Sequence, residues 1–471
     1  MQMIDIYTHT EIKDGIQAAI NRSRELATPI LFSYTFQFEV RDLLPLLTHP
    51  ADKNDFRIYW EQPDEGFSLA GLGCILDVQL SKSKEMSDVN QVLNEVFSNL
   101  VSISVHSTVG PRFLGGHAFN PNAESDETWQ EIPRARFILP ECLATLTEDG
   151  SWLTISRMIN GDEGIESVVN EFKRNCTHYE KRLPVTLPPI KYVPVDKYQD
   201  IPNRQEYDNM IFSVLKEIRP GKLEKVVISR SHHVKVGQEF SVVSAIQVLR
   251  NVYPKCTNFF FNFPGKSVFF GSTPERLIRK RKNTLDTEAL AGTIARGRNM
   301  EEDRLLAETL FDSHKEREEH RFVIDQIRRK LEPIIPELGI PHEPHILKLK
   351  NVQHLRTPIS GKLKNGENVL ELVQLLHPTP AVAGTPTNHA MAVIRKLEPH
   401  DRGWYSGPVG WIDPKGDGDF FVALRSALVK EGESHVFAGG GIVSESLPDQ
   451  EWLETELKLQ PIITALSGGQ V

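Results

Sequence analysis

The mixed order of strand-like and helix-like segments constrains the fold of this chain more than any other feature. The helix-like segments are 10–26, 161–182, 204–218, 301–331 and 450–466, the last interrupted near Pro461. The strand-like segments are 30–40, 67–76, 135–139, 152–158, 223–233, 258–263, 267–270, 276–279, a strand–turn–strand unit over 404–428, and 436–443. The two kinds are intermixed without the regular strand–helix–strand alternation of a doubly wound sheet. We therefore predict an α+β fold.

A proline-rich stretch divides the chain. It reads Leu-Pro-Val-Thr-Leu-Pro-Pro-Ile-Lys-Tyr-Val-Pro over 183–194 and is followed by Ile201-Pro202. Because proline fixes φ and lacks a backbone N–H, this stretch is neither continuous helix nor a central strand. It is either a linker or an ordered connection across the surface. We place a boundary here, between an N-terminal region, 1–190, and a second region, 204–465.

Composition excludes several classes of function. The 471 residues carry a net charge of -9, which leaves no basic footprint for nucleic acid. The four cysteines form no C-x-x-C pair, so we expect isolated thiols in a reducing compartment. The N-terminus shows no secretory pattern, and no apolar stretch is long enough to span a bilayer. We expect a cytoplasmic protein that does not bind membranes.

Two predicted helices carry carboxylates in notable positions. Glu319 shares an apolar stripe with Val323 and Ile327, where an unpaired carboxylate is costly. Glu451 and Glu454 share a helix face with Lys458. Carboxylates without thiols suit a hard cation such as Mg²⁺. For Glu319 alone, an ordinary ion pair with a nearby arginine at the edge of the stripe is the favoured alternative.

Three further features are suggestive but individually weak. The glycine run 439–441 at a strand end would let backbone amides approach an anion, or would only permit a bulge or tight packing. Lys225 opens an apolar strand, where it is buried if the strand is central and reaches water if the strand is at an edge. Glu275 lies at a turn between two strands, where the simple alternative is a solvated carboxylate.

Together these segments resemble the chorismate-utilising enzymes. That family includes isochorismate synthases, salicylate synthases and the large subunits of anthranilate and aminodeoxychorismate synthases. The resemblance covers about 204–465, and several motifs in one order make chance agreement very unlikely. The motifs are Lys225–Arg230, Gly271–Glu275, Leu290–Thr293, Lys315–His320, His354–Thr357, His377–Gly384, Tyr405–Gly410, Ala438–Val443 and Glu451–Thr455.

The resemblance implies a fold and a set of roles. The fold is one α+β domain in which two sheets pack face to face with helices outside, and the N-terminal region belongs to it. Lys225 corresponds to the general base, Glu275 to the general acid, and His354 to an active-site histidine near the substrate ring. Glu319 and Glu454 correspond to Mg²⁺ ligands, with Glu451 close by. The positions that correspond to substrate-binding groups are Gly292, Thr293, Ala381, Tyr405, Arg425, Gly439, Gly441 and Lys458.

Two alanines select among the members of the family. Ala291 stands where some aminodeoxychorismate synthases carry a nucleophilic lysine, and Ala381 stands where ammonia-using and salicylate-forming members usually carry threonine. Both resemble the isochorismate synthases, and the long N-terminal region resembles the menaquinone-pathway type. The expected substrate is chorismate, with Mg²⁺ as cofactor, no glutamine amidotransferase subunit, and a monomer or weak dimer. The alternatives are a siderophore-pathway isochorismate synthase, a salicylate synthase, and a non-catalytic chorismate-binding homologue.

Overall fold

The computed structural model describes residues 6–48, 56–80, 85–182, 186–221, 223–237, 240–263 and 267–469. Residues 1–5, within the segment where a secretory pattern was sought, and residues 183–185 of the proline-rich stretch lie outside the described residues.

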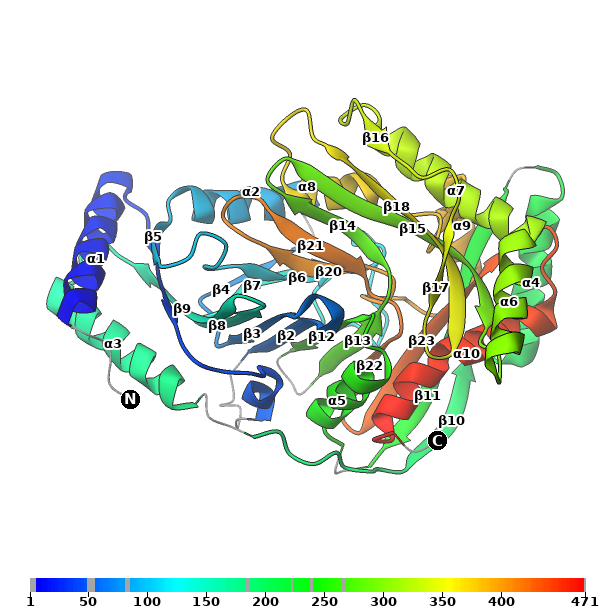
Figure 1. Ribbon diagram of the computed structural model, residues 1–471, viewed down its shortest axis with the longest axis horizontal. Helices are drawn as coiled ribbons and strands as arrows, with labels where there is room; N and C mark the ends of the chain where they lie inside the picture. The colour runs from blue at the N-terminus through cyan, green and yellow to red at the C-terminus, as the bar shows by residue number, and fades with distance from the viewer. Residues whose placement is uncertain are drawn as a thin grey trace.

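Helices and strands follow one another along the chain in mixed order (Figure 1). The helices are α1 (Ile6–Leu26), α2 (Met86–Ser98), α3 (Ile165–Arg182), α4 (Arg204–Ile218), α5 (Val242–Val252), α6 (Met300–Asp312), α7 (His314–Leu331), α8 (Val369–Leu376), α9 (Thr387–Leu397) and α10 (Pro448–Leu466). The strands are β1 (Ile30–Gln37), β2 (Arg57–Gln62), β3 (Phe67–Leu72), β4 (Leu76–Gln79), β5 (Val101–Ser104), β6 (Phe113–His117), β7 (Ala135–Leu139), β8 (Cys142–Thr147), β9 (Gly150–Ile159), β10 (Val195–Ile201), β11 (Lys225–Val236), β12 (Thr257–Asn262), β13 (Val268–Thr273), β14 (Arg276–Arg281), β15 (Thr284–Ala295), β16 (Leu338–Gly339), β17 (His345–Lys348), β18 (Val352–Lys362), β19 (Gly384–Thr385), β20 (Pro408–Ile412), β21 (Gly418–Val422), β22 (Ser426–Lys430) and β23 (Glu433–Ile442).

The strands form two large sheets, as the α+β prediction requires. The larger runs in the order β10-β11-β23-β22-β13-β12-β2-β3-β8-β9-β1-β5, with β19 also on β11. The smaller runs β16-β18-β15-β14-β21-β20-β6-β7-β4, with β17 also on β18. Both sheets take strands from either side of residue 190, so the proline-rich stretch does not separate two structural units. The strand that follows it, β10, lies at an edge of the larger sheet.

Aromatic side chains join the two sheets. Trp60 of β2 packs edge-to-face on Phe421 of β21 at 5.6 Å between ring centroids, inside a core built from both sheets. Helices α1 and α3 pack together at one end of the molecule, while α4, α6, α7 and α10 gather at the other (Figure 1). In the second group, α7 packs on β15 and α10 packs on β23, and these two helices line the pocket described below.

The helix predictions were correct for α1 and α4 and wrong at two places. The stripe Ile12, Ile16, Ala19 and Ile20 of α1 is fully buried. The single helix predicted over 301–331 is two helices, because Ser313 adopts an extended backbone and caps α7 by accepting the N–H of Glu316. The interruption predicted at Pro461 is absent, because this buried proline is accommodated inside the continuous helix α10.

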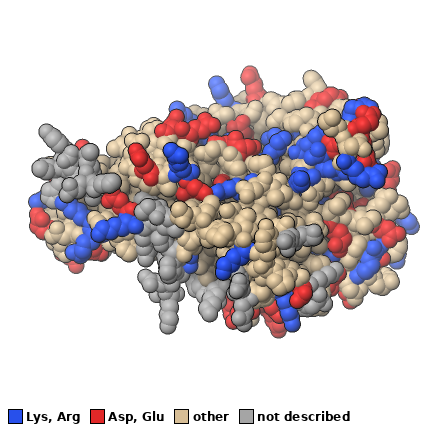
Figure 2. Space-filling view, turned by 60° about the horizontal axis from the view of Figure 1, so that its bottom comes forward, with Lys and Arg blue, Asp and Glu red and all other residues tan. Residues whose placement is uncertain are grey.

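Charge distribution, thiols and helix hydropathy complete the description of the fold. Acidic and basic side chains are interspersed over the face shown in Figure 2. All four cysteines are free thiols. In the described part of the chain, no helix is long and apolar enough to cross a membrane.

Candidate active site

One pocket brings together nearly all of the site residues predicted from the sequence. It is lined from both sheets, by β11, β15, β18 and β23, and by helices α7 and α10. The predicted residues on its wall are Lys225, Glu275, Gly292, Thr293, Glu319, His354, Ala381, Tyr405, Arg425, Gly439, Gly441, Glu454 and Lys458. Glu451 lies just behind this wall, one turn before Glu454 on α10.

Lys225 is buried at the start of a central strand. Its side chain is 1% exposed, and β11 pairs with β23 on one side and with β10 and β19 on the other. The amine donates to Glu319 Oε1 at 2.7 Å, so Glu319 is paired with a lysine from the opposite wall and not with an arginine. Burial by itself would raise the pKa of Glu319, but Lys225, Lys458 and Lys315 together lower it.

Glu275 is a buried carboxyl group on the same pocket. It follows β13 in a turn held by the Thr273 hydroxyl, which accepts the Glu275 N–H. Burial, reinforced by the negative charge of Glu288, raises the pKa of Glu275 to about 8, while Lys225 and Lys458 oppose the shift. Near neutral pH this carboxyl group is therefore a proton donor, in contrast to the ionised Glu319.

The rim formed by α7 and α10 concentrates carboxylates and lysines. Lys458 donates to Glu454 at 2.7 Å and to the Gly439 carbonyl at 2.9 Å, and Lys315 lies 3.5 Å from Glu451. Burial and the neighbouring Glu454 raise the pKa of Glu451. Burial and the neighbouring Glu319 raise the pKa of Glu316, a carboxylate that the sequence analysis did not assign to the site. The rim thus holds more acidic groups than its lysines neutralise.

These carboxylates have the donor chemistry of a Mg²⁺ site. They offer only oxygen ligands, and Glu451 Oε2 is buried with no hydrogen-bond partner among the described residues. Among the described residues, three metal-type ligand atoms lie close together only at Asp200, His232 and Glu456, outside this pocket. The pocket carboxylates are therefore spaced more widely. Mg²⁺ usually takes one or two protein carboxylates and completes its shell with water and substrate. The open arrangement around Glu319 and Glu454 therefore fits this ion.

The glycine run on β23 has two physical consequences. A Cβ on Gly441 would lie 2.7 Å from Lys225 Cε and 2.9 Å from Glu319 Oε1, so only glycine leaves room for their ion pair. The N–H groups of Val227 and Ser229 bond away from β23. Gly441 lies opposite Val227, and Gly439 lies opposite Ser229. In an antiparallel pair, the backbone N–H groups of two opposite residues point either both toward or both away from the partner strand. The N–H groups of Gly439 and Gly441 therefore point away from β11 and toward the pocket.

His354 and Arg425 form a pair on the opposite wall. Arg425 donates to His354 Nε2 at 3.1 Å, and His354 Nδ1 lies 3.2 Å from the Gly292 carbonyl. Burial first, and then Arg425 and Lys458, lower the pKa of His354 well below its usual value. This histidine is therefore neutral, and its Nε2 accepts the hydrogen bond that orients the Arg425 guanidinium.

Backbone geometry fixes the loop at the top of β15. Gly292 has φ +78°, and its strand is bulged against β18 between Ala291 and Thr293. A Cβ on Gly292 would lie 3.2 Å from Glu316 Oε2, which accepts the Thr293 N–H at 3.0 Å. The bulge therefore ties the pocket wall to helix α7.

A buried ion pair at the pocket wall was missed by the sequence analysis. Arg402 and Glu398 are fully buried and paired. Arg402 also donates at 2.8 Å to the carbonyls of Val227 and Val382, which both line the pocket. Arg402 stands three residues before the Tyr405–Gly410 motif, but nothing in the sequence around it indicates that its side chain is buried. This pair holds the Lys225 strand against the segment that carries Ala381.

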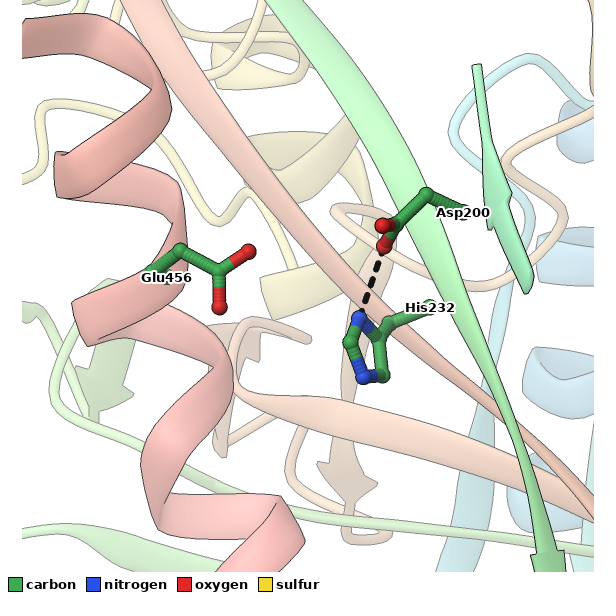
Figure 3. A group of neighbouring side chains, drawn as sticks. All are labelled: Asp200, His232 and Glu456. Carbon is green, nitrogen blue, oxygen red and sulfur yellow. Dashed lines mark hydrogen bonds and ion pairs between the residues drawn. The ribbon is translucent and has the colours of Figure 1, made fainter. Parts of the chain in front are cut away.

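A second group of metal-type ligands lies outside the pocket. Ligand atoms of Asp200 on β10, His232 on β11 and Glu456 on α10 lie within 4.8 Å of one another (Figure 3). The buried Arg230 donates to both carboxylates, and its guanidinium lies 3.7 Å from the centroid of the Trp452 ring. Because Arg230 already donates to both carboxylates, the group is a structural ion-pair cluster that fastens α10 to the larger sheet.

The sequence profile of a known family covers this fold and this site together. The family described as chorismate binding enzyme matches residues 16–467. The chain belongs to this family. It is 32% identical over 466 residues to isochorismate synthase MenF of Bacillus subtilis (strain 168), covering 96% of each protein. It is 33% identical over 459 residues to the salicylate biosynthesis isochorismate synthase of Pseudomonas aeruginosa, covering 97% of this chain and 94% of that protein.

The fold agrees with that membership. The solved structure of MenF, the menaquinone-specific isochorismate synthase from Escherichia coli, matches with a TM-score of 0.78 and 26% sequence identity. The match covers 96% of this chain and 100% of that one. The resemblance read from the motifs is therefore confirmed, and it extends through the N-terminal region to nearly the full length of the chain.

Proposed function

We propose that the protein is an isochorismate synthase that converts chorismate to isochorismate. The observation that carries the proposal is that the buried amine of Lys225 and the buried carboxyl group of Glu275 line the same pocket. The names of both full-length relatives support the same reaction.

The reaction needs a base and an acid at separate positions on the substrate ring. Water adds at C2 while hydroxide leaves from C4, and water is a poor nucleophile as hydroxide is a poor leaving group. Lys225, in its neutral amine form, takes a proton from the attacking water. Glu275, whose pKa is raised to about 8, gives its proton to the departing hydroxyl group. The two residues reach the pocket from β11 and from the turn before β14, so each can serve its own position.

Chorismate is a dianion, so the pocket must supply positive charge and N–H donors. Arg425 and Lys458 supply the charge, and the inward-facing amides of Gly439 and Gly441 supply the donors. Gly292, Thr293, Ala381 and Tyr405 shape the remaining wall. Tyr405 stacks on Phe437 at 5.3 Å, which fixes the flat side of the pocket.

The proposal includes Mg²⁺ held by Glu319 and Glu454, with Glu451 beside them. When bound, the ion would supply charge that binds a substrate carboxylate and offsets the acidic rim. Lys315 lies 3.5 Å from Glu451 and Lys458 lies 2.7 Å from Glu454, so each lysine offsets part of the negative charge of the rim. His354 keeps Arg425 directed toward the pocket.

Ala291 and Ala381 make water the nucleophile in this proposal. Ala291 offers no amine for covalent attack, and Ala381 places a methyl group where a threonine would place a hydroxyl. No amidotransferase subunit is then needed to deliver ammonia. A monomer or weak dimer, and a cytoplasmic location that suits the four free thiols, complete the proposal.

We assign the product to menaquinone biosynthesis on the full-length similarity to two MenF proteins, of which the Escherichia coli one is described as menaquinone-specific. The Pseudomonas relative, at nearly equal identity, favours salicylate biosynthesis as the second candidate pathway. Deleting the gene and measuring menaquinone and salicylate by mass spectrometry separates them. Loss of menaquinone supports the first pathway, and loss of salicylate alone contradicts it.

The activity is tested by incubating pure protein with chorismate and Mg²⁺ and identifying the product by chromatography. Isochorismate is expected, and chelation with EDTA should abolish its formation. Steady formation of fluorescent salicylate with release of pyruvate would show a salicylate synthase. Absence of any turnover in the folded, Mg²⁺-loaded protein would support a non-catalytic chorismate-binding homologue.

A further inference from the structure

A second carboxylate, Glu288, stands behind Glu275 and outside the pocket wall. It lies on β15 and is 7% exposed. Side chains two residues apart on a strand share a face, so Glu288 points to the same side as Leu290, which lines the pocket. Glu288 therefore lies on the same face of β15 as Leu290, next to the peptide that follows Glu275.

Both oxygens of Glu288 are held in place. Oε1 accepts the backbone N–H of Arg276 at 3.0 Å, and Arg276 immediately follows Glu275 in the chain. Oε2 accepts Nε of Arg356 at 2.5 Å, across the β15–β18 pairing. His345 on the neighbouring β17 also faces this pair. The contacts fix the distance between Glu288 and the peptide that carries Glu275.

Four ionisable groups face Glu275 from the surrounding elements. Lys225 faces it from β11, Lys458 from α10, Tyr405 from the loop before β20, and Glu288 from β15. The two lysines favour the ionised carboxylate, which could not donate a proton. Burial opposes them, and Glu288 is the negative charge that adds to burial.

We propose that Glu288 is a positioning residue whose fixed negative charge keeps Glu275 protonated for transfer to the leaving hydroxyl group. The inference rests on the proposed function, because it assigns Glu288 a part in that proton transfer. Glu288 touches neither the pocket nor the substrate, and it acts through Glu275. Its ion pair with Arg356 lets this buried charge be tolerated at a fixed place.

The test separates the charge of Glu288 from its shape. Glu275 must be protonated to act, so kcat/KM of the wild-type protein should fall as pH rises through about 8. Glu288→Gln keeps the shape and removes the charge, so this basic limb should move down by on the order of one pH unit. Glu288→Asp keeps the charge and disturbs the packing, so the limb should stay near its wild-type position even if kcat falls at every pH.

A purely structural role gives the opposite ranking. It predicts that the shorter Asp does more harm than the isosteric Gln and that neither variant moves the limb. An unmoved limb in Glu288→Gln, or the same displacement in both variants, would overturn the proposal. Glu288→Met removes the same charge without burying an amide against Arg356, so it must also move the limb downward if Glu288→Gln fails to fold.

A measurement without turnover keeps the two proposals apart. The infrared band of a protonated carboxyl group that disappears in Glu275→Gln reports directly on Glu275 in the substrate-free protein. Its loss should occur near pH 8 in the wild-type protein and at lower pH in Glu288→Gln. If wild-type protein makes no isochorismate, the proposed function fails, while this titration still decides whether Glu288 controls Glu275.

Discussion

The buried carboxyl group of Glu275 is expected to destabilise the fold at alkaline pH, where it is ionised. Its folded pKa is about 8 against an ordinary value of 4.5, so the proton it binds stabilises the fold fully below pH 4.5. That stabilisation is lost as pH rises through about 8. Glu275→Gln should therefore raise the melting temperature by a few degrees at pH 8.5, show little gain at pH 4.5, and abolish turnover.

Differential scanning fluorimetry across this pH range checks the prediction. A melting-temperature gain that is equal at both pH values would contradict it, because the effect would then not come from ionisation.

Lys225 is expected to be essential for turnover. General-base catalysis contributes on the order of 10²–10⁴-fold, so Lys225→Ala should lower kcat by at least about 10². Lys235, at an exposed position of the same strand, provides the matched control, and Lys235→Ala should keep nearly wild-type kcat. Steady-state kinetics with purified variants measures both, and an unchanged kcat in Lys225→Ala would remove the assigned base.

The sequence predicted which residues belong to the site better than it predicted which of them are buried and paired. Lys225, Glu275 and Glu319 were assigned through motifs, since family motifs record chemistry directly. Arg402 and Glu398 were missed, because nothing local in the sequence indicates that two charged residues near a loop are fully buried and paired. The same holds for Glu288, whose partners Arg276 and Arg356 lie on other strands.

At the scale of elements, Arg230 should be the main fastening of helix α10. Its fully buried guanidinium joins Asp200, Thr455 and Glu456. Arg230→Met leaves buried charge without its partner and should destabilise the fold by about 3–5 kcal/mol. Because α10 carries Glu454, the variant should also need more Mg²⁺ for half-maximal activity.

Arg204, the first residue of α4, offers the matched control because it also contacts α10. It is 39% exposed, lies over the same Trp452 ring and pairs with Asp449 of α10. Arg204→Met should cost at most about 1 kcal/mol, as exposed pairs do, and should not change the Mg²⁺ requirement. Urea unfolding and Mg²⁺ titration compare the two. Equal effects from both variants would refute a special role for Arg230.

Elements were predictable where periodicity was strong and uninterrupted. Helix α4 was placed at its observed bounds, because apolar spacing over 15 residues leaves little choice. The break between α6 and α7 was missed, since Ser313 sits inside a run of good helix formers and only its cap contact reveals the break. At Pro461 the reverse happened, because tertiary packing overrode a helix-breaking residue.

At the scale of the whole molecule, the two sheets make the chain cooperative. Strands β1–β9 precede the proline-rich stretch and pair with later strands in both sheets, for example β2 with β12 and β6 with β20. A fragment covering 204–471 should therefore be insoluble or unfolded by circular dichroism. A soluble, folded and active fragment would show that the boundary near residue 190 does separate independent domains.

The α+β class followed from element order, but the pairing of strands across the proline-rich stretch did not. Sequence periodicity records which face of a strand is buried and carries no information about a partner 200 residues away. For this reason the proline-rich stretch suggested a boundary, while strands from both sides of it share both sheets.

The most direct test of the proposed water addition is whether oxygen from the solvent enters the product. Purified protein is incubated with unlabelled chorismate and Mg²⁺ in H₂¹⁸O, and the product is examined by mass spectrometry and NMR. We expect isochorismate that carries one ¹⁸O atom, in the hydroxyl group at C2. Unlabelled isochorismate would contradict water addition, and salicylate with pyruvate would contradict the assigned reaction.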